Sequence, residues 1–166
     1  MNRLPVRFFS ACLGLGLLGS AAMAATLEDV LARPAAPGGV VFEIVDRDPD
    51  ALGLALPWVR QAGERLRARY PGLPLALVAH GQEMFALQQS QRDRHAQVHA
   101  LAESLSRDRD IPVHVCETHA GWRGLGAESF PAYINVAPSG PVQIRNYELL
   151  DYVRIVVPRA AASGPR

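Results

Sequence analysis

The sequence predicts a single three-layer α/β domain, in which a mainly parallel sheet of roughly five strands carries helices on both faces. Two observations predict this fold. Strand-like and helix-like runs alternate along the chain, which is the order that right-handed crossovers between parallel strands require. The strand-like run at residues 75–79 is also wholly apolar, as a strand buried on both faces would be. The length of 166 residues suits one domain.

The first half of the domain contains a strand, a helix and a second strand. Residues 40–45 are rich in β-branched side chains and end at Asp46, ahead of a turn. Because proline fits the first turn of a helix but not its interior, we expect the regular part of the next helix to begin at Pro57. The second strand, residues 75–79, ends at His80. Apolar residues at every fourth position support the helix: Leu54, Trp58, Ala62, Leu66 and Tyr70.

The second half is expected to contain two helices and three strands. A helix is expected over residues 93–108, because its apolar side chains share one face and charged side chains occupy the other. A third strand over residues 111–115 leads directly into Cys116. Weaker patterns predict a fourth strand at residues 133–136, a short helix at 146–150 and a fifth strand at 153–157.

The N-terminus has the pattern of an export signal. Arg3 and Arg7 precede an apolar run over residues 8–18, which is followed by small residues. Ala22-Met23-Ala24 matches the small-x-small cleavage pattern, so we expect residues 1–24 to be removed and the protein to be periplasmic. An uncleaved membrane anchor is the alternative, since the uncharged stretch is just long enough for one. The glycines and the cleavage motif favour removal, after which no membrane attachment is expected.

Cleavage changes the composition of the chain. The full sequence holds 17 basic and 16 acidic residues and two cysteines. Removal of residues 1–24 takes Arg3, Arg7 and Cys12, which leaves 15 basic against 16 acidic residues, a net charge of −1, and Cys116 as the one cysteine. An unpaired thiol in an oxidising compartment is buried, paired between chains, or reactive.

The chain around the domain has no motif of its own. Residues 25–39 contain a short helical turn, Thr26 to Ala32, and then a cluster of proline and glycine, so we expect a linker there. The domain itself is expected over residues 40–158. Residues 159–166 are small and polar, which predicts a flexible tail.

Composition excludes several classes of function. The charge is nearly balanced, which excludes a nucleic-acid binder that works through a broad basic face. Every basic residue is arginine, so Schiff-base chemistry and the lysine of a P-loop are absent. No C-x-x-C pair and no dinucleotide fingerprint occur. No cofactor is therefore expected.

Polar groups gather where the predicted strands end. Ligands of an open parallel sheet bind outside the carboxyl ends of its strands. Asp46, His80 and Cys116 directly follow three strands, and His119 and Arg123 follow in the loop after the third. We expect Cys116 and His80 to lie on one edge of the sheet. His119 or Arg123 could supply a cation that supports a Cys116 thiolate, the reactive form of the thiol.

Two other interpretations of Cys116 stay open. Free cysteine is among the most buried residue types, so Cys116 can simply end a buried strand without reacting. Alternatively, His114, Cys116 and His119 form an H-x-C-x2-H pattern whose imidazoles and thiolate would suit zinc or copper. Structural zinc sites usually bring paired cysteines, and this favours a His114 that packs within the sheet.

The order of these elements resembles the DsrE/DsrF-like family of sulfur-relay proteins, over residues 40–158. The cysteine after the third strand is the most specific feature of the resemblance. The other features are the strands V-V-F-E-I-V (40–45) and L-A-L-V-A-H-G (75–81), the stretch V-H-V-C-E-T (113–118), the glycines up to Gly126, V-A-P-S-G (136–140), and the closing helix and strand (147–157).

The resemblance implies a domain that assembles into a homo-oligomer, a trimer or hexamer, and carries sulfur as a persulfide on Cys116. Its partners would be sulfur donors and acceptors, either proteins or small thiols. Two features depart from the family: its best understood members work in the cytoplasm, and the H-x-C-x2-H pattern matches no family motif. Three hypotheses follow: an exported sulfur carrier, a binding or assembly module with a buried Cys116, and a metal-binding protein.

Overall fold

The computed structural model describes residues 24–159. The predicted export signal, apart from Ala24, and the tail beyond Arg159 lie outside these residues. The strands are β1 (Gly39–Ile44), β2 (Leu75–Ala79), β3 (Val113–Cys116), β4 (Ile134–Ala137) and β5 (Tyr152–Val156). The α-helices are α1 (Leu27–Leu31), α2 (Leu52–Arg69), α3 (Ala96–Arg107), α4 (Glu117–Gly121) and α5 (Gly140–Leu149). Three 3₁₀ segments complete the described chain, η1 (Gln82–Leu87), η2 (Gln89–Gln91) and η3 (Ala127–Ser129).

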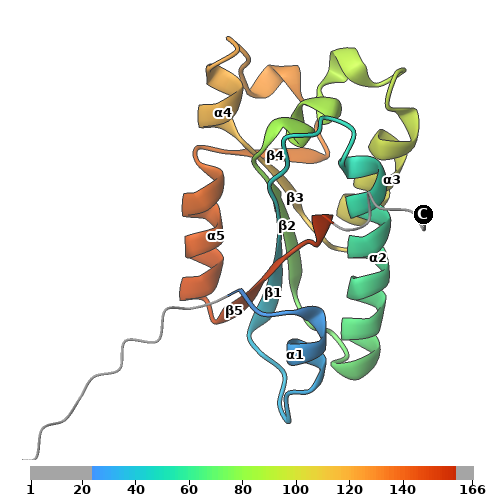
Figure 1. Cartoon of the computed structure of the whole chain (residues 1–166), viewed down its shortest axis with the longest axis vertical. Coiled ribbons are helices and arrows are strands. Elements are labelled where there is room, and N and C mark those ends of the chain that lie inside the picture. The colour runs from blue at the N-terminus through green and yellow to red at the C-terminus, as the bar shows by residue number, and fades with distance from the viewer. Residues whose placement is uncertain (1–23, 160–166) are drawn as a thin grey trace, which may run out of the picture.

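The five strands form one sheet in the order β4-β3-β2-β1-β5, and every neighbouring pair is parallel. The predicted α/β class is confirmed, and the sheet is wholly rather than mainly parallel. All strands run in one direction, so their carboxyl ends meet at one edge, at the top of the molecule in Figure 1. That edge is where the polar residues after β1, β2 and β3 come together.

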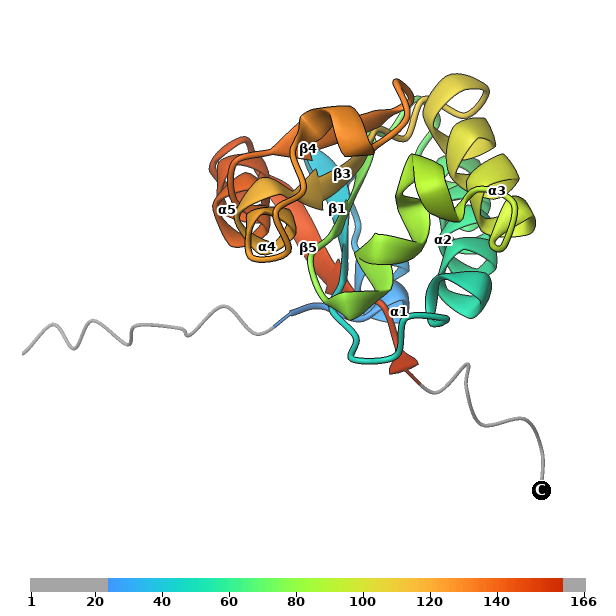
Figure 2. The ribbon, with the colours of Figure 1, turned by 90° about the horizontal axis from the view of Figure 1, so that it is seen from above.

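The sheet lies between two unequal helical layers. Helices α2 and α3 cover one face, whereas α5 and the short α4 lie on the other (Figure 2). The larger apolar cluster includes Phe42, Leu56 and Leu77, and the smaller one contains Val41 and Val78 with Ile144 of α5. Among residues 24–159, no helix is both long and apolar enough to cross a membrane.

The segment expected as a linker packs against the domain. Thr26 caps α1 through a capping box with Asp29, and Leu27 and Val30 of α1 are buried. The Tyr70 hydroxyl, at the end of α2, reaches the backbone carbonyl of Val30 at 3.0 Å. Residues 25–39 therefore close the lower end of the apolar core as well as leading into β1.

Helices α2 and α5 both begin several residues before their predicted starts. In each case the sequence around a proline does not show whether the proline begins the helix or follows its first residues. Helix α2 begins at Leu52, so Pro57 lies in its second turn and removes one backbone hydrogen bond there. Helix α5 begins at Gly140, six residues before the predicted start, and Pro141 occupies its first turn, where proline is tolerated.

The glycine-bearing stretch after β3, expected as a loop, begins with helix α4 directly after Cys116. The remaining bounds agree closely with expectation. Helix α3 begins at Ala96 rather than residue 93, and strands β3, β4 and β5 each differ from prediction by one or two residues at their ends.

Helix α3 carries a fully buried histidine. His99 is 1% exposed, and its ring bridges the Tyr133 hydroxyl at 2.6 Å and the Ala86 carbonyl at 3.0 Å. A carbonyl only accepts hydrogen bonds, so Nε2–H donates to Ala86 and Nδ1 accepts from Tyr133. Burial lowers the pKa of His99, because the charged ring would lose its hydration.

This burial predicts a pH dependence of stability. The unfolded chain takes up a proton at His99 near pH 6.5, whereas the folded ring does so only at lower pH. Stability is therefore lost as pH falls below about 6.5, and burial lowers the pKa of His114 to the same effect. We expect His99→Gln to be less stable than wild type by about 1–3 kcal/mol at neutral pH. In urea unfolding, the difference in the free energy of unfolding between wild type and His99→Gln should narrow toward pH 5. A difference that stays constant with pH would contradict this prediction.

Candidate functional site

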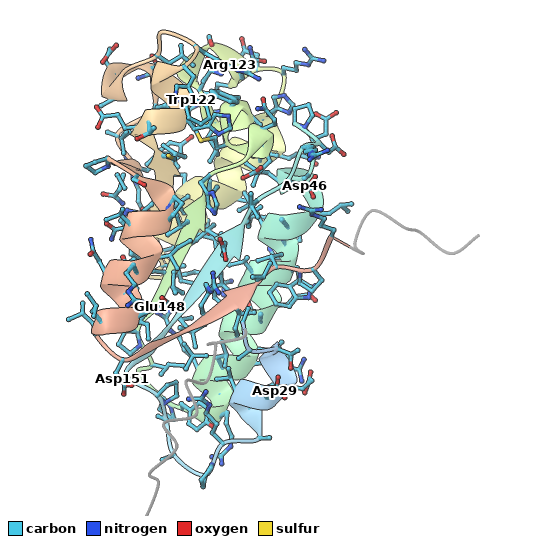
Figure 3. All side chains as sticks on the ribbon, turned by 60° about the vertical axis from the view of Figure 1, so that its left-hand side comes forward. Asp29, Asp46, Trp122, Arg123, Glu148 and Asp151 are labelled. Carbon is cyan, nitrogen blue, oxygen red and sulfur yellow. The ribbon has the colours of Figure 1, made fainter. Side chains whose placement is uncertain are left out.

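A cleft of about 570 Å³ opens at the carboxyl edge of the sheet. Its walls come from the ends of β2 and β3, the segment after β1, helix α4 and the start of α5. In Figure 3, Asp46, Trp122 and Arg123 mark this end of the molecule, whereas Glu148 and Asp151 mark the opposite end. The side chains that matter for its chemistry are His80, Gln82, Cys116, His119, Trp122 and Arg159.

Cys116 lies in the wall of this cleft. It is the last residue of β3 and the N-cap of α4, where its Sγ accepts a hydrogen bond from the His119 backbone N–H at 3.4 Å. The residue is 5% exposed and forms no disulfide. The sulfur therefore sits in a polar backbone setting at the edge of a cleft, with little of its surface open to solvent.

Helix α5 approaches this site closely because its first residue is glycine. A Cβ on Gly140 would lie 2.5 Å from the Cβ of His80 and 3.4 Å from the Cβ of Cys116. The first of these distances is a severe overlap, so no larger residue fits without displacement. His80 and Cys116 consequently lie side by side under the start of α5, on one edge of the sheet as the strand order predicts.

His119 lines the cleft and Arg123 contacts the cleft residue Gln82, and within residues 24–159 no hydrogen bond joins either side chain to the Cys116 sulfur. The ring of His119 donates from Nδ1 to the His80 carbonyl at 2.9 Å and faces the Gln82 side-chain nitrogen through Nε2 at 3.1 Å. The guanidinium of Arg123 bonds to the Gln82 oxygen and lies 3.7 Å above the ring of Phe85. What His119 offers to Cys116 is its backbone N–H.

Sequence reasoning missed the residues that hold His80. Glu43 accepts a hydrogen bond from His80 Nε2 at 2.8 Å, and Arg154 of β5 contacts the other carboxylate oxygen at 3.3 Å. The hydrogen bond from His80 lowers the pKa of Glu43; burial opposes that effect, and the charge of Arg154 adds to it. Lone charges in two otherwise apolar strands, V-V-F-E-I-V and Y-V-R-I-V, were the available signal.

A second missed carboxylate holds the ends of β1 and β2 together. Glu83 is fully buried and accepts backbone N–H groups from Asp46 at 2.8 Å and Gly81 at 2.9 Å. Burial raises the pKa of Glu83, and these N–H groups act against the rise. Its role in the described contacts is to fix the backbone that leads from each strand into the cleft.

The residues of the metal hypothesis do not converge. His114 points under α5 and meets the Tyr147 hydroxyl at 2.9 Å, while the ring of His119 is engaged by His80 and Gln82. Within residues 24–159, no group of three or more His, Cys, Asp or Glu side chains is arranged to hold a metal ion. The H-x-C-x2-H pattern therefore reflects three side chains with separate structural partners.

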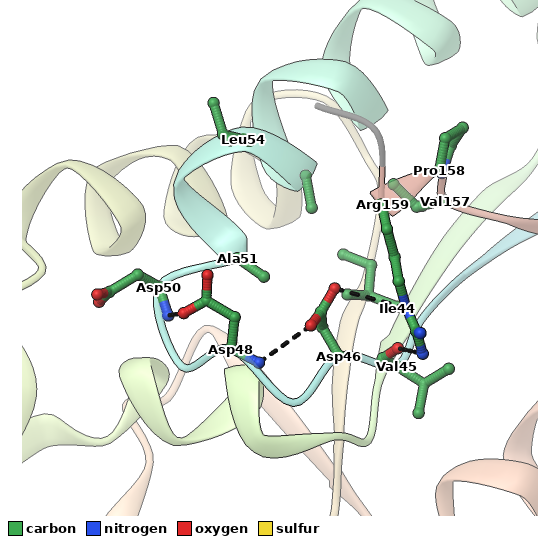
Figure 4. Close-up of a pocket in the computed structure, with 11 residues that line it drawn as sticks. Ile44, Val45, Asp46, Asp48, Asp50, Ala51, Leu54, Val157, Pro158 and Arg159 are labelled. Atoms are coloured by element: carbon green, nitrogen blue, oxygen red, sulfur yellow. Dashed lines mark hydrogen bonds and ion pairs between the residues drawn. The ribbon is translucent and has the colours of Figure 1, made fainter. Parts of the chain in front are cut away.

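Figure 4 shows a second cleft, of about 460 Å³, which shares Val45, Asp46 and Arg159 with the first. Asp46 and Asp48 form part of its wall, and each accepts a backbone N–H from the residue two positions later. Arg159 pairs with Asp46 at 3.7 Å and donates to the Val45 carbonyl at 3.0 Å. Asp46 and Arg159 line both clefts, so this ion pair stands between them.

Comparisons with known proteins support the fold and leave the site unassigned. No family model matches the chain, and no curated protein matches it. The solved structure of MTH1491, a protein of unknown function from Methanobacterium thermoautotrophicum, is similar, with a TM-score of 0.55 and 19% sequence identity. The match covers 70% of this chain and 96% of that chain. At this identity the likeness concerns the fold alone.

The Glu43–His80 contact predicts an acid-sensitive contribution to stability. We expect Glu43→Gln to destabilise the protein by about 1–3 kcal/mol at neutral pH, since a charged hydrogen-bond acceptor is lost from a site that is mostly buried. The folded pKa of Glu43 lies below its unfolded value, so this contribution is present above about pH 4.5 and is lost as pH falls further. Urea unfolding of both proteins should show the difference shrinking toward low pH; a constant difference would contradict it.

Proposed function

We propose that this protein is an exported sulfur carrier of the DsrE/DsrF-like type, which holds sulfane sulfur on Cys116 as a persulfide. The observation that carries the proposal is that Cys116 lines a cleft of about 570 Å³ and that its Sγ accepts a backbone N–H. A hydrogen bond to sulfur favours the anionic forms that sulfur exchange needs. Cys116 is also the one cysteine of the chain after the predicted export signal.

The transfer step needs one nucleophile and no cofactor. The Cys116 thiolate attacks the outer sulfur of a persulfide donor, and a new S–S bond forms between Sγ and that sulfur. The donor's own S–S bond breaks, and its remaining sulfur leaves with the electron pair as a thiolate. An acceptor thiolate then attacks the outer sulfur of the Cys116 persulfide. The S–S bond to Sγ breaks, Cys116 leaves as a thiolate, and the acceptor becomes the persulfide.

The proposal includes assembly and location. Val142, Leu149 and Leu150 are large apolar side chains on or just after α5 with more than half of their surface exposed. Such a surface would favour a homo-oligomer of the trimeric or hexameric kind that the resemblance implies. Export would be supported by recovery of a periplasmic protein whose N-terminal residue is Ala25.

A second candidate function is a binding or assembly module in which Cys116 does not react. The observation that favours it is that Cys116 is only 5% exposed. A thiol closed off by its surroundings is an inert packing group, and the cleft beside it would then serve a ligand that does not touch sulfur.

Sulfur loading tests the first candidate. The Cys12→Ser chain, which keeps Cys116 as its single thiol, is exposed to inorganic polysulfide and its intact mass is measured. We expect a gain of one or more sulfur atoms that cyanide removes, because cyanide takes sulfane sulfur from a persulfide. The matched control Cys12→Ser/Cys116→Ser should gain none. Equal masses in the two proteins would overturn the sulfur-carrier proposal.

Thiol labelling separates the two candidates. In the Cys12→Ser chain, a small neutral reagent should label native Cys116 at a rate within about tenfold of the rate in urea if the cleft gives access to the sulfur. A native rate slower by several orders of magnitude would favour the buried, non-reacting thiol.

A further inference from the structure

Four side chains form a row across four neighbouring strands beneath α5. They are Arg154 of β5, Glu43 of β1, His80 at the end of β2, and Cys116 of β3. Arg154 contacts Glu43 at 3.3 Å, and Glu43 contacts His80 at 2.8 Å. Ala79 pairs with Val115, so the next residues, His80 and Cys116, lie level with each other on adjacent strands. The row therefore ends at Cys116, the residue beside His80 on the next strand.

We propose that Glu43 and His80 form a proton-handling pair for Cys116, in which His80 takes the thiol proton and Glu43 positions and stabilises the charged ring. The inference deepens the sulfur-carrier proposal, because it says how the thiolate of that site is generated. It concerns the reactivity of the thiol itself, however, so it can be tested without any sulfur donor.

The hydrogen-bond chemistry determines which ring nitrogen is free. A carboxylate only accepts hydrogen bonds, so the Nε2 of His80 carries the hydrogen that Glu43 accepts. The remaining nitrogen, Nδ1, has no hydrogen-bond partner among residues 24–159. In the neutral ring Nδ1 is unprotonated and is a proton acceptor. His80 and Cys116 line the same cleft, follow one register pair on adjacent strands and both approach Gly140. The proposed proton transfer runs between them, directly or through one water molecule.

The rings of the two other histidines near Cys116, His114 and His119, form hydrogen bonds elsewhere. Both ring nitrogens of His119 have partners, at His80 and Gln82, and His114 bonds to Tyr147 below the site. Among these three, His80 is the histidine that both lines the cleft and keeps a ring nitrogen without a hydrogen-bond partner within residues 24–159, since His114 is not part of the cleft wall. His80 also shares its close neighbour, Gly140, with Cys116. The contacts of the structure therefore favour His80 as the proton acceptor, whereas sequence spacing favoured His119 and Arg123.

The charged surroundings of His80 come from several elements. Glu43 and Arg154 flank it on the β1 side, and the start of α5 presents Gly140, which has no ionisable group. Glu43 is the one carboxylate in direct contact with the ring among the described residues, so a protonated His80 would form an ion pair with it at 2.8 Å. The other ionisable groups around the ring and along the cleft are Asp46, Arg47, Glu83, Cys116, His119 and Arg159.

The proton balance of the transfer follows. The Cys116 thiol gives its proton to His80 Nδ1, which leaves a thiolate and an imidazolium whose Nε2–H still bonds to Glu43. The thiolate takes the outer sulfur from a donor R–S–SH, and R–S⁻ leaves with the electron pair. The imidazolium returns its proton to R–S⁻. The products are a Cys116 persulfide and R–SH, with no oxidant or reductant needed.

The test is the pH dependence of Cys116 alkylation by iodoacetamide in the Cys12→Ser chain, compared with His80→Gln and Glu43→Gln in the same background. At neutral pH we expect His80→Gln to react at least about tenfold more slowly, and Glu43→Gln to react at an intermediate rate. The midpoint of each rate curve should move to higher pH. At high pH, where the thiol ionises without help, the rates should converge.

His114→Gln is the matched control, because it removes a half-buried histidine from β3 two residues from Cys116 and on the same face of the sheet. Its rate curve should follow that of the Cys12→Ser chain. Circular dichroism and urea unfolding establish that each variant is folded at the pH values used. A purely structural effect of His80→Gln would change the rate at high pH and leave the midpoint in place.

The outcomes separate the two proposals. Rate curves for His80→Gln and Glu43→Gln that keep the Cys12→Ser midpoint would overturn the proton-handling pair, whatever the protein does with sulfur. A shifted midpoint together with no polysulfide loading would support the pair and overturn the sulfur-carrier function. A shifted midpoint with loading that slows in parallel would support both.

Discussion

The close approach of α5 to the ends of β2 and β3 is the constraint on which the site depends. Gly140 permits it, because any side chain at that position would overlap the Cβ of His80. Because α5 packs closely against the ends of β2 and β3, His80 and Cys116 are mostly shielded from bulk solvent. Both residues form part of the cleft wall.

The two faces of the sheet differ in polarity. The face toward α2 and α3 is apolar throughout and supplies most of the buried side chains of the core. The face toward α5 has a much smaller apolar cluster, and around it lie Glu43, His80, His114 and Arg154 in hydrogen-bonded positions. Buried polar groups reduce stability unless they are paired, and the hydrogen bonds among these side chains offset that cost on the face that carries the candidate chemistry.

Much of the fold could be predicted from residue patterns because each strand has a simple local signal. The apolar run at residues 75–79 is buried throughout, as predicted. The predicted stripe of α2 is only partly right: Ala62, Leu66 and Tyr70 are buried, but Leu54 is 47% exposed because the buried face of the helix runs through Leu52, Leu56 and Val59. The start of α5 was not predictable in this way, because Gly140-Pro141 is equally compatible with a turn. Its role depends on what packs against Gly140, which only the tertiary structure determines.

The site was predictable in its location and not in its contacts. The carboxyl edge of a parallel sheet follows from topology, so His80 and Cys116 could be placed there from strand order alone. Glu43 and Arg154 are far from them in sequence, and their pairing depends on β1 and β5 being neighbours. His119 and Arg123 are close to Cys116 in sequence, but both side chains contact Gln82, His119 from within α4 and Arg123 from just after it.

Arg159 gives the C-terminal end of the domain a practical importance. It holds Asp46 and the Val45 carbonyl at the wall between the two clefts, so the last described residue belongs to the rim of the site. A purification tag or surface tether attached at this end would leave the domain beside the cleft and could obstruct reagents or partners. An attachment point near α1, at the far end of the strands, would keep the rim clear.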